Sequence, residues 1–131
     1  MTSIKKYQPR ILIVDDEPTN LRVLRQILQN DYALSFARSG KDALALIDKE
    51  MPDLILLDIM MPEMTGLEFI KASKIIAPNI PVIIISAFGD EDTKRLFIKE
   101  GAFQYIEKPF DIENIVQIIN EASAVNLRKK Q

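Results

Sequence analysis

The sequence predicts an α/β domain built on a parallel sheet. Three short apolar runs and one further strand-like segment end in acidic, hydroxyl or basic residues. Between them lie segments whose apolar residues repeat at helical spacing. Short, unbroken apolar runs are typical of strands buried on both faces, and their alternation with helices is typical of βα units.

Five segments have the composition expected of strands. Four are bounded by clear polar or turn residues, and the segment at 32–37 is the weakest candidate. The five candidates are residues 11–14, 32–37, 54–57, 82–85 and 104–107.

Five helices are expected between and after these strands. Pro18 suits a first helical turn, Ser39 and Asp90 are candidate N-caps, Asp111 opens the last helix, and Gly101 suits a C-terminal stop. The apolar faces are Leu21, Leu24, Ile27 and Leu28; Ala43, Leu44, Ile47 and Met51; Leu67, Phe69, Ile70 and Ile75; and Ile112, Ile115, Val116, Ile119 and Ala122.

The residues that end the strands carry the chemistry. Asp15 and Asp16 follow the first strand, Asp58 ends the third, Ser86 ends the fourth and Lys108 follows the fifth. In an open parallel sheet the functional crevice lies beyond the carboxyl ends of the strands. Three carboxylates, one hydroxyl and one ammonium are therefore expected at one edge, a set that suits a hard cation and a phosphoryl group.

Composition excludes several classes of function. The 131 residues suffice for one domain with a core, and the net charge of −2 does not favour nucleic acid as a partner. The chain has no cysteine and no histidine, which excludes thiolate metal sites, thiol nucleophiles and a Ser-His-Asp triad. Neither a membrane span nor a signal peptide is recognisable, so a cytoplasmic location is expected.

The chain resembles the receiver domains of two-component response regulators. The resemblance rests on residues 11–18, 53–62 with Gly66, 83–87 and 108–110. It implies a doubly wound, flavodoxin-like (βα)5 fold, whose five parallel strands have the order 2-1-3-4-5. It extends over residues 10–126 as one receiver domain, with 1–9 as a lead segment and 127–131 as a tail or the start of a linker.

The resemblance implies that Asp58 is the phosphorylated residue and that Mg²⁺ is the cofactor. A carboxylate can attack phosphorus and form an acyl phosphate. Asp15 and Asp16 match the acidic pair that holds Mg²⁺ together with Asp58 and the backbone carbonyl of Met60. The alternative role for Asp15 is to cap the first helix, and for Asp58 to cap a loop.

The resemblance assigns roles to three further side chains. Lys108 is expected to pair with Asp58 and then with a phosphoryl oxygen, aimed by a cis bond between Lys108 and Pro109. Ser86 is expected to move its hydroxyl to the phosphoryl group, and Tyr105 to swing inward in response. The plainer alternatives are a surface lysine, a hydroxyl bonded to backbone and a half-exposed strand tyrosine.

Met60 and Phe88 lie two residues beyond Asp58 and Ser86. In receivers these positions tune how fast water removes the phosphoryl group. Both side chains are bulky and apolar, so we expect them to shield the acyl phosphate and slow its hydrolysis.

The expected function is a phosphorylation-controlled switch that assists only its own phosphorylation and dephosphorylation. The phosphodonor would be a sensor histidine kinase or a histidine phosphotransfer protein, and the switch would control an output domain or effector protein. The responsive face would comprise the fourth helix, fifth strand and fifth helix, which could also support a homodimer. No direct contact with nucleic acid or membrane is expected.

Three alternative functions fit the sequence less well. A receiver-like interaction module that never takes phosphate usually lacks one acid or the lysine, whereas this chain keeps every position. A haloacid-dehalogenase-type phosphohydrolase needs a second aspartate where this chain has Met60. Rossmann and P-loop nucleotide binding fit poorly because neither glycine motif is present. The polar ending at 126–131 slightly favours a fragment of a longer protein.

Overall fold

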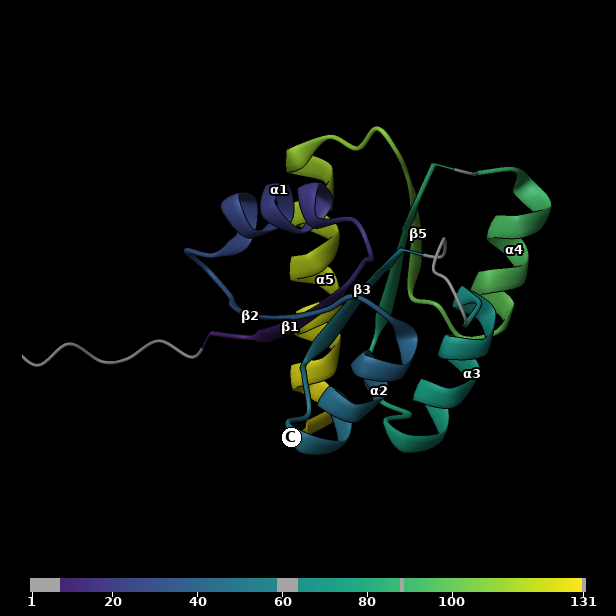
Figure 1. Cartoon of the computed structure of the whole chain (residues 1–131), viewed down its shortest axis with the longest axis horizontal. Helices are drawn as coiled ribbons and strands as arrows, with labels where there is room; N and C mark the ends of the chain where they lie inside the picture. Colours follow the sequence, from purple (N-terminus) through teal and green to yellow (C-terminus); the bar gives the residue numbers. More distant parts are fainter. Residues whose placement is uncertain (1–7, 59–63, 88, 131) are drawn as a thin grey trace, which may run out of the picture.

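In the computed structural model five strands alternate with five helices along the chain (Figure 1). The structure describes residues 8–58, 64–87 and 89–130, with side chains as far as Ala124. The strands are β1 (Arg10–Val14), β2 (Ala33–Ala37), β3 (Leu54–Asp58), β4 (Val82–Ser86) and β5 (Gln104–Glu107). The helices are α1 (Pro18–Leu28), α2 (Gly40–Lys49), α3 (Gly66–Ile76), α4 (Glu91–Lys99) and α5 (Ile112–Lys130).

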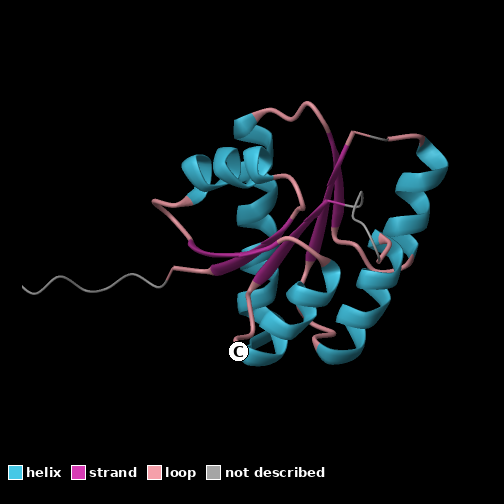
Figure 2. Cartoon of the chain, in the orientation of Figure 1, coloured by secondary structure: helices cyan, strands magenta, loops and turns pink. Residues whose placement is uncertain are grey.

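All strand pairs are parallel, and the strand order is β2-β1-β3-β4-β5. This order confirms the doubly wound fold that the sequence predicted. The sheet lies between two layers of helices, with α1 and α5 on one face and α2, α3 and α4 on the other (Figure 2). The chain reverses its winding between β1 and β3, which opens a crevice at the carboxyl ends of these strands.

Each strand supplies residues to two cores because its side chains alternate between the two faces. Ile11 and Ile13 of β1 pack with α1 and α5, whereas Leu12 and Val14 pack with α2 and α3. Every residue of β3 and of β4 is buried. Central strands covered on both faces explain why the apolar runs show no polar alternation.

The predicted N-caps Ser39 and Asp90 and the predicted helix stop at Gly101 are confirmed. The hydroxyl of Ser39 accepts a bond from the Asp42 N–H at 3.1 Å, and Oδ1 of Asp90 accepts one from the Thr93 N–H at 2.7 Å. Gly101 follows α4 with a φ of 119°, a left-handed conformation that favours glycine. A capping box between Thr65 and Glu68 starts α3 and was not predicted.

Three residues predicted on apolar helix faces are exposed instead. Met51 lies beyond the end of α2, while Ile75 on α3 and Ile112 on α5 are 82% and 54% exposed. Asp15 does not cap α1, because the N-cap residue is Glu17 and makes no side-chain capping bond. Within the described ranges, no helix is long and apolar enough to cross a membrane.

Candidate functional site

Acidic and basic side chains converge where β1, β3 and β5 end. Asp15 follows β1, Asp58 is the last residue of β3, and Lys108 follows β5. All three line a cavity of about 620 Å³ at this edge of the sheet, together with Asn20 from α1. The parallel register therefore brings together residues that are far apart in the chain, as the sequence predicted for this crevice.

Lys108 and Asp58 form an ion pair. The Lys108 Nζ lies 3.2 Å from Oδ2 of Asp58, and the two side chains are 25% and 11% exposed. Because the pair is largely shielded from water, its attraction is weakened by salt less than that of a surface pair. Lys108 is therefore not a solvated surface lysine, and its ammonium can reach any group attached to Asp58.

Asp15 is a buried carboxylate beside this pair. It is 3% exposed, and its Oδ1 accepts a bond from the Glu17 N–H at 2.9 Å. Burial raises the pKa of Asp15 above its ordinary value, and the nearby Asp58 charge raises it further. The bonds from Glu17 and the Asn20 side chain oppose this rise, as does the Lys108 charge. A cation bound in addition to the Lys108 ammonium would relieve the repulsion between the Asp15 and Asp58 carboxylates.

The acidic residues fit a magnesium ion in part. Asp16 is half-buried next to Asp15, and its backbone carbonyl accepts a bond from Arg38 at 3.3 Å. Across residues 8–58, 64–87 and 89–130, no three acidic side chains form a cluster that could by itself enclose a metal. Mg²⁺ usually takes one or two carboxylates directly and keeps several waters, so Asp15, Asp16 and Asp58 need not all bind the ion directly.

Ser86 is the last residue of β4, and Tyr105 is the second residue of β5. Ser86 is fully buried, and its carbonyl accepts a bond from the Lys108 N–H at 2.7 Å. Tyr105 is 9% exposed, and its ring meets Phe97 of α4 edge-on at a centroid distance of 5.8 Å. The alternative of a half-exposed tyrosine is therefore wrong, and the ring already packs inside the core beneath α4.

Of the remaining site predictions, the structure bears on the cis bond but not on Met60 or Phe88. The bond between Lys108 and Pro109 is cis, the isomer that the resemblance implied. The expected carbonyl ligand of Met60 and the shielding side chains of Met60 and Phe88 lie outside the described residues.

Two features of the site were missed at the sequence level. Asn20 hydrogen-bonds Asp15 from the first turn of α1 and lines the same cavity. The rest of the cavity wall is mainly apolar and includes Val23 and Ile112, which are 44% and 54% exposed. The only sequence signal for Asn20 was its place in the first turn of the helix after the acidic pair.

Comparisons with known proteins agree with this geometry. The family model of the response regulator receiver domain matches residues 11–120. Sporulation initiation phosphotransferase F of Bacillus subtilis is 40% identical over 107 residues, which are 81% of this chain and 86% of that protein. The transcriptional regulatory protein ZraR of Salmonella typhimurium is 36% identical over 115 residues, 87% of this chain but only 26% of that protein.

A solved structure of a receiver domain is also similar to this chain. The CheY-like response regulator receiver domain protein of Methanospirillum hungatei superposes with a TM-score of 0.88 at 28% identity, covering 94% of this chain and 99% of that one. The chain thus spans about a quarter of the ZraR length and nearly all of a single receiver. From its sequence, fold and strand-end residues, the chain belongs to the response regulator receiver domain family.

Proposed function

We propose that Asp58 accepts a phosphoryl group from a phosphohistidine on a partner protein. The observation that supports this most is the Lys108 ammonium, held 3.2 Å from the Asp58 carboxylate in a cavity that Asp15 also lines. An oxygen of Asp58 attacks phosphorus, the bond from phosphorus to the donor's ring nitrogen breaks, and an acyl phosphate forms on Asp58.

Lys108 and Ser86 assist this transfer through their polar hydrogens. The Lys108 ammonium stabilises the negative charge that builds on the transferred oxygens, and the Ser86 hydroxyl donates a hydrogen bond to one of them. Asp15, Asp16 and Asp58 would hold Mg²⁺, which adds positive charge at the phosphoryl oxygens when it is bound. Asn20 and the Glu17 N–H keep the Asp15 carboxylate in place for this role.

The donor is expected to contact the apolar wall of the cavity. A phosphohistidine that reached Asp58 through this cavity would pass α1 and the start of α5, where Val23 and Ile112 are exposed. Exposed apolar side chains beside a reactive group are typical of a protein contact. A histidine kinase or histidine phosphotransfer protein with apolar side chains around its histidine would fit this wall.

The phosphorylated receiver would then control an output domain or an effector protein. The responsive face would comprise α4, β5 and α5, which could also serve a homodimer. We also propose that the chain removes its own phosphoryl group slowly and that it acts in the cytoplasm. Shielding of the phosphoryl group by Met60 and Phe88 stays a prediction.

The test is phosphorylation by a small phosphodonor. The wild-type protein is incubated with acetyl phosphate, with and without Mg²⁺, and its intact mass is measured. We expect one added phosphoryl group that requires Mg²⁺ and is absent from Asp58→Asn. The control Asp48→Asn changes an exposed residue of α2 and is expected to behave as wild type. A folded wild-type protein that gains no phosphoryl group would favour the receiver-like interaction module.

A further inference from the structure

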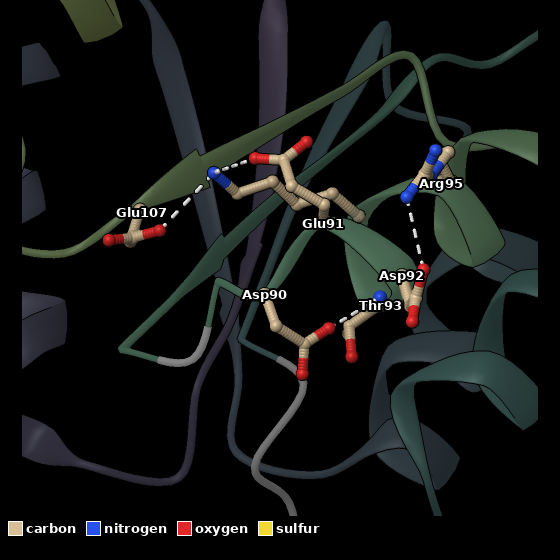
Figure 3. A network of polar contacts seen from close by, with 7 residues as sticks. Asp90, Glu91, Asp92, Thr93, Arg95 and Glu107 are labelled. Carbon is tan, nitrogen blue, oxygen red and sulfur yellow. Dashed lines mark hydrogen bonds and ion pairs between the residues drawn. The ribbon is translucent and has the colours of Figure 1, made fainter.

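Lys94 connects α4 to the end of β5. Its Nζ lies 3.2 Å from Oε1 of Glu107 and 3.8 Å from Oε1 of Glu91. Figure 3 shows Glu91 and Glu107 on either side of the nitrogen they share. Glu107 is the last residue of β5 and directly precedes Lys108. The Lys94 ammonium therefore joins the first half of α4 to the end of β5, directly before Lys108.

The Glu107 carboxylate also packs against Gly89. A Cβ atom placed on Gly89 would overlap Oε1 of Glu107, so a larger residue there would require the carboxylate to move. Gly89 immediately precedes Asp90, the N-cap of α4. The Glu107 carboxylate thus lies close to two parts of the same region, the residue before the α4 cap and the ammonium one turn into the helix.

Glu107 also lies beside Ser86 and Lys108, the two residues proposed to contact the phosphoryl group. Ser86 is its register partner across the sheet, and the next residue, Lys108, donates its backbone N–H to the Ser86 carbonyl at 2.7 Å. A change in the position of Ser86 or Lys108 is therefore expected to shift the backbone of Glu107. Through Lys94 and Gly89, that shift reaches the start of α4.

We propose that Lys94 and Glu107 are positioning residues that hold the start of α4 against β5 and thereby oppose phosphoryl binding at Asp58. The inference rests on the proposed function, because it concerns the affinity of that site. In the proposed function the hydroxyl of the fully buried Ser86 moves to the phosphoryl group, and such a movement would disturb the contact between Glu107, Gly89 and Lys94. Without the ion pair, the rearrangement meets less resistance.

The size of the effect follows from the exposure of the pair. The Lys94 and Glu107 side chains are 30% and 51% exposed, so the pair is comparable to the surface ion pairs that shift an equilibrium by roughly twofold to fivefold. The effect is expected to fade at high salt, because ions screen partly exposed charges.

The experiment measures the affinity of the full chain for beryllofluoride in the presence of Mg²⁺, by fluorine NMR or calorimetry. Lys94→Gln removes the charge while keeping a similar helix propensity. It is expected to bind beryllofluoride roughly twofold to fivefold more tightly than wild type at low salt. Lys94→Arg keeps the ion pair and is expected to restore the wild-type affinity.

Arg95→Gln is the matched control. Arg95 pairs with Asp92 at 3.0 Å, three residues away on α4, as Lys94 pairs with Glu91. The pair of Arg95 and Asp92 does not involve β5 (Figure 3). Its loss is expected to leave the affinity unchanged. Gly89→Ala displaces the Glu107 carboxylate, so adding Lys94→Gln to Gly89→Ala is expected to produce little further change.

The outcomes separate this inference from the proposed function. Tighter, salt-dependent binding by Lys94→Gln, with Arg95→Gln unchanged, supports the inference. If wild type binds beryllofluoride and Lys94→Gln binds equally or more weakly, the inference is wrong and the proposed function stands. If wild type binds no better than Asp58→Asn, the proposed function itself fails.

Discussion

The Lys108 ammonium lies 3.2 Å from the Asp58 carboxylate, although β4 separates β3, which ends in Asp58, from β5, which Lys108 follows. The contact bridges a whole strand because Lys108 lies beyond the end of β5 and its side chain is long enough to cross in front of β4. It joins the proposed phosphoryl acceptor to the group best placed to neutralise a phosphoryl oxygen.

Loss of the Lys108 charge should slow phosphorylation sharply. Lys108→Ala removes the fixed positive charge from the site, and losing one such stabilising group typically lowers a transfer rate by about 10²-fold or more. The rate is measured with acetyl phosphate and Mg²⁺ by intact mass. Lys71→Ala on the exposed side of α3 is the control. Equal rates for Lys108→Ala and wild type would remove Lys108 from the mechanism.

The contribution of Asp15 to the stability of the metal-free protein should fall as the pH rises. Burial raises the pKa of Asp15 above its ordinary value of 3.8, so the fold favours the neutral acid. The native state then holds more protons than the unfolded state, and stability is lost as the pH rises through the raised pKa. The melting temperature of wild type relative to Asp15→Asn is therefore expected to be lower at pH 7.5 than at pH 5.

Mg²⁺ should reverse this loss at neutral pH. The ion binds the charged carboxylates of the native state, so it raises the melting temperature of wild type more at pH 7.5 than at pH 5, where protons compete with it. Asp48→Asn, on the exposed face of α2, should respond as wild type does. A magnesium response that Asp15→Asn fully retains would contradict the assignment of Asp15 to the metal site.

The apolar wall of the cavity should affect phosphoryl transfer from a protein donor but not from a small phosphodonor. Val23→Glu places a charge on the exposed wall of the cavity, which disfavours an apolar contact. Transfer from a phosphohistidine-bearing protein that phosphorylates wild type is expected to slow about tenfold or more, whereas phosphorylation by acetyl phosphate is unchanged. Met51→Glu is the control, because Met51 is similarly exposed at the opposite edge of the sheet.

A defect of Val23→Glu with both donors would instead indicate damage to the site itself. Equal transfer by Val23→Glu and Met51→Glu from the protein donor would show that the donor docks elsewhere. Circular dichroism of each variant checks that the fold is retained.

Tyr105 should behave as a core residue. Its ring packs edge-on against Phe97, so Tyr105→Ala is expected to lower the free energy of unfolding by about 3 kcal/mol or more. Tyr105→Phe keeps the ring and should cost less than about 1.5 kcal/mol. Urea unfolding provides both values. A cost below about 1 kcal/mol for Tyr105→Ala would show that the ring contributes little to packing beneath α4.

The fold could be predicted because local signals and the global arrangement agree. The unbroken apolar runs marked the central strands, and Ser39, Asp90 and Gly101 marked helix ends through contacts within one turn. Ile75 and Ile112 were placed wrongly because periodicity identifies an apolar face without showing what covers it. Exposure at these positions depends on the spacing of neighbouring elements.

The site could be predicted only in part. Strand ends and the resemblance together pointed to Asp15, Asp58 and Lys108, which the structure brings to one cavity. The bond from Asn20 to Asp15 and the ion pair between Lys94 and Glu107 were not predicted. Both depend on how a helix docks on the sheet, and no sequence pattern specifies that distance.

The most direct test of the central claim is to locate the phosphoryl group in the chain. The protein is phosphorylated with Mg²⁺ and acetyl phosphate, the acyl phosphate is reduced with borohydride, and the modified residue is found by peptide mass spectrometry. We predict a single modified residue, Asp58, at the end of β3. Modification at another residue, or none in a folded protein that binds Mg²⁺, would contradict the claim that Asp58 is the phosphoryl acceptor.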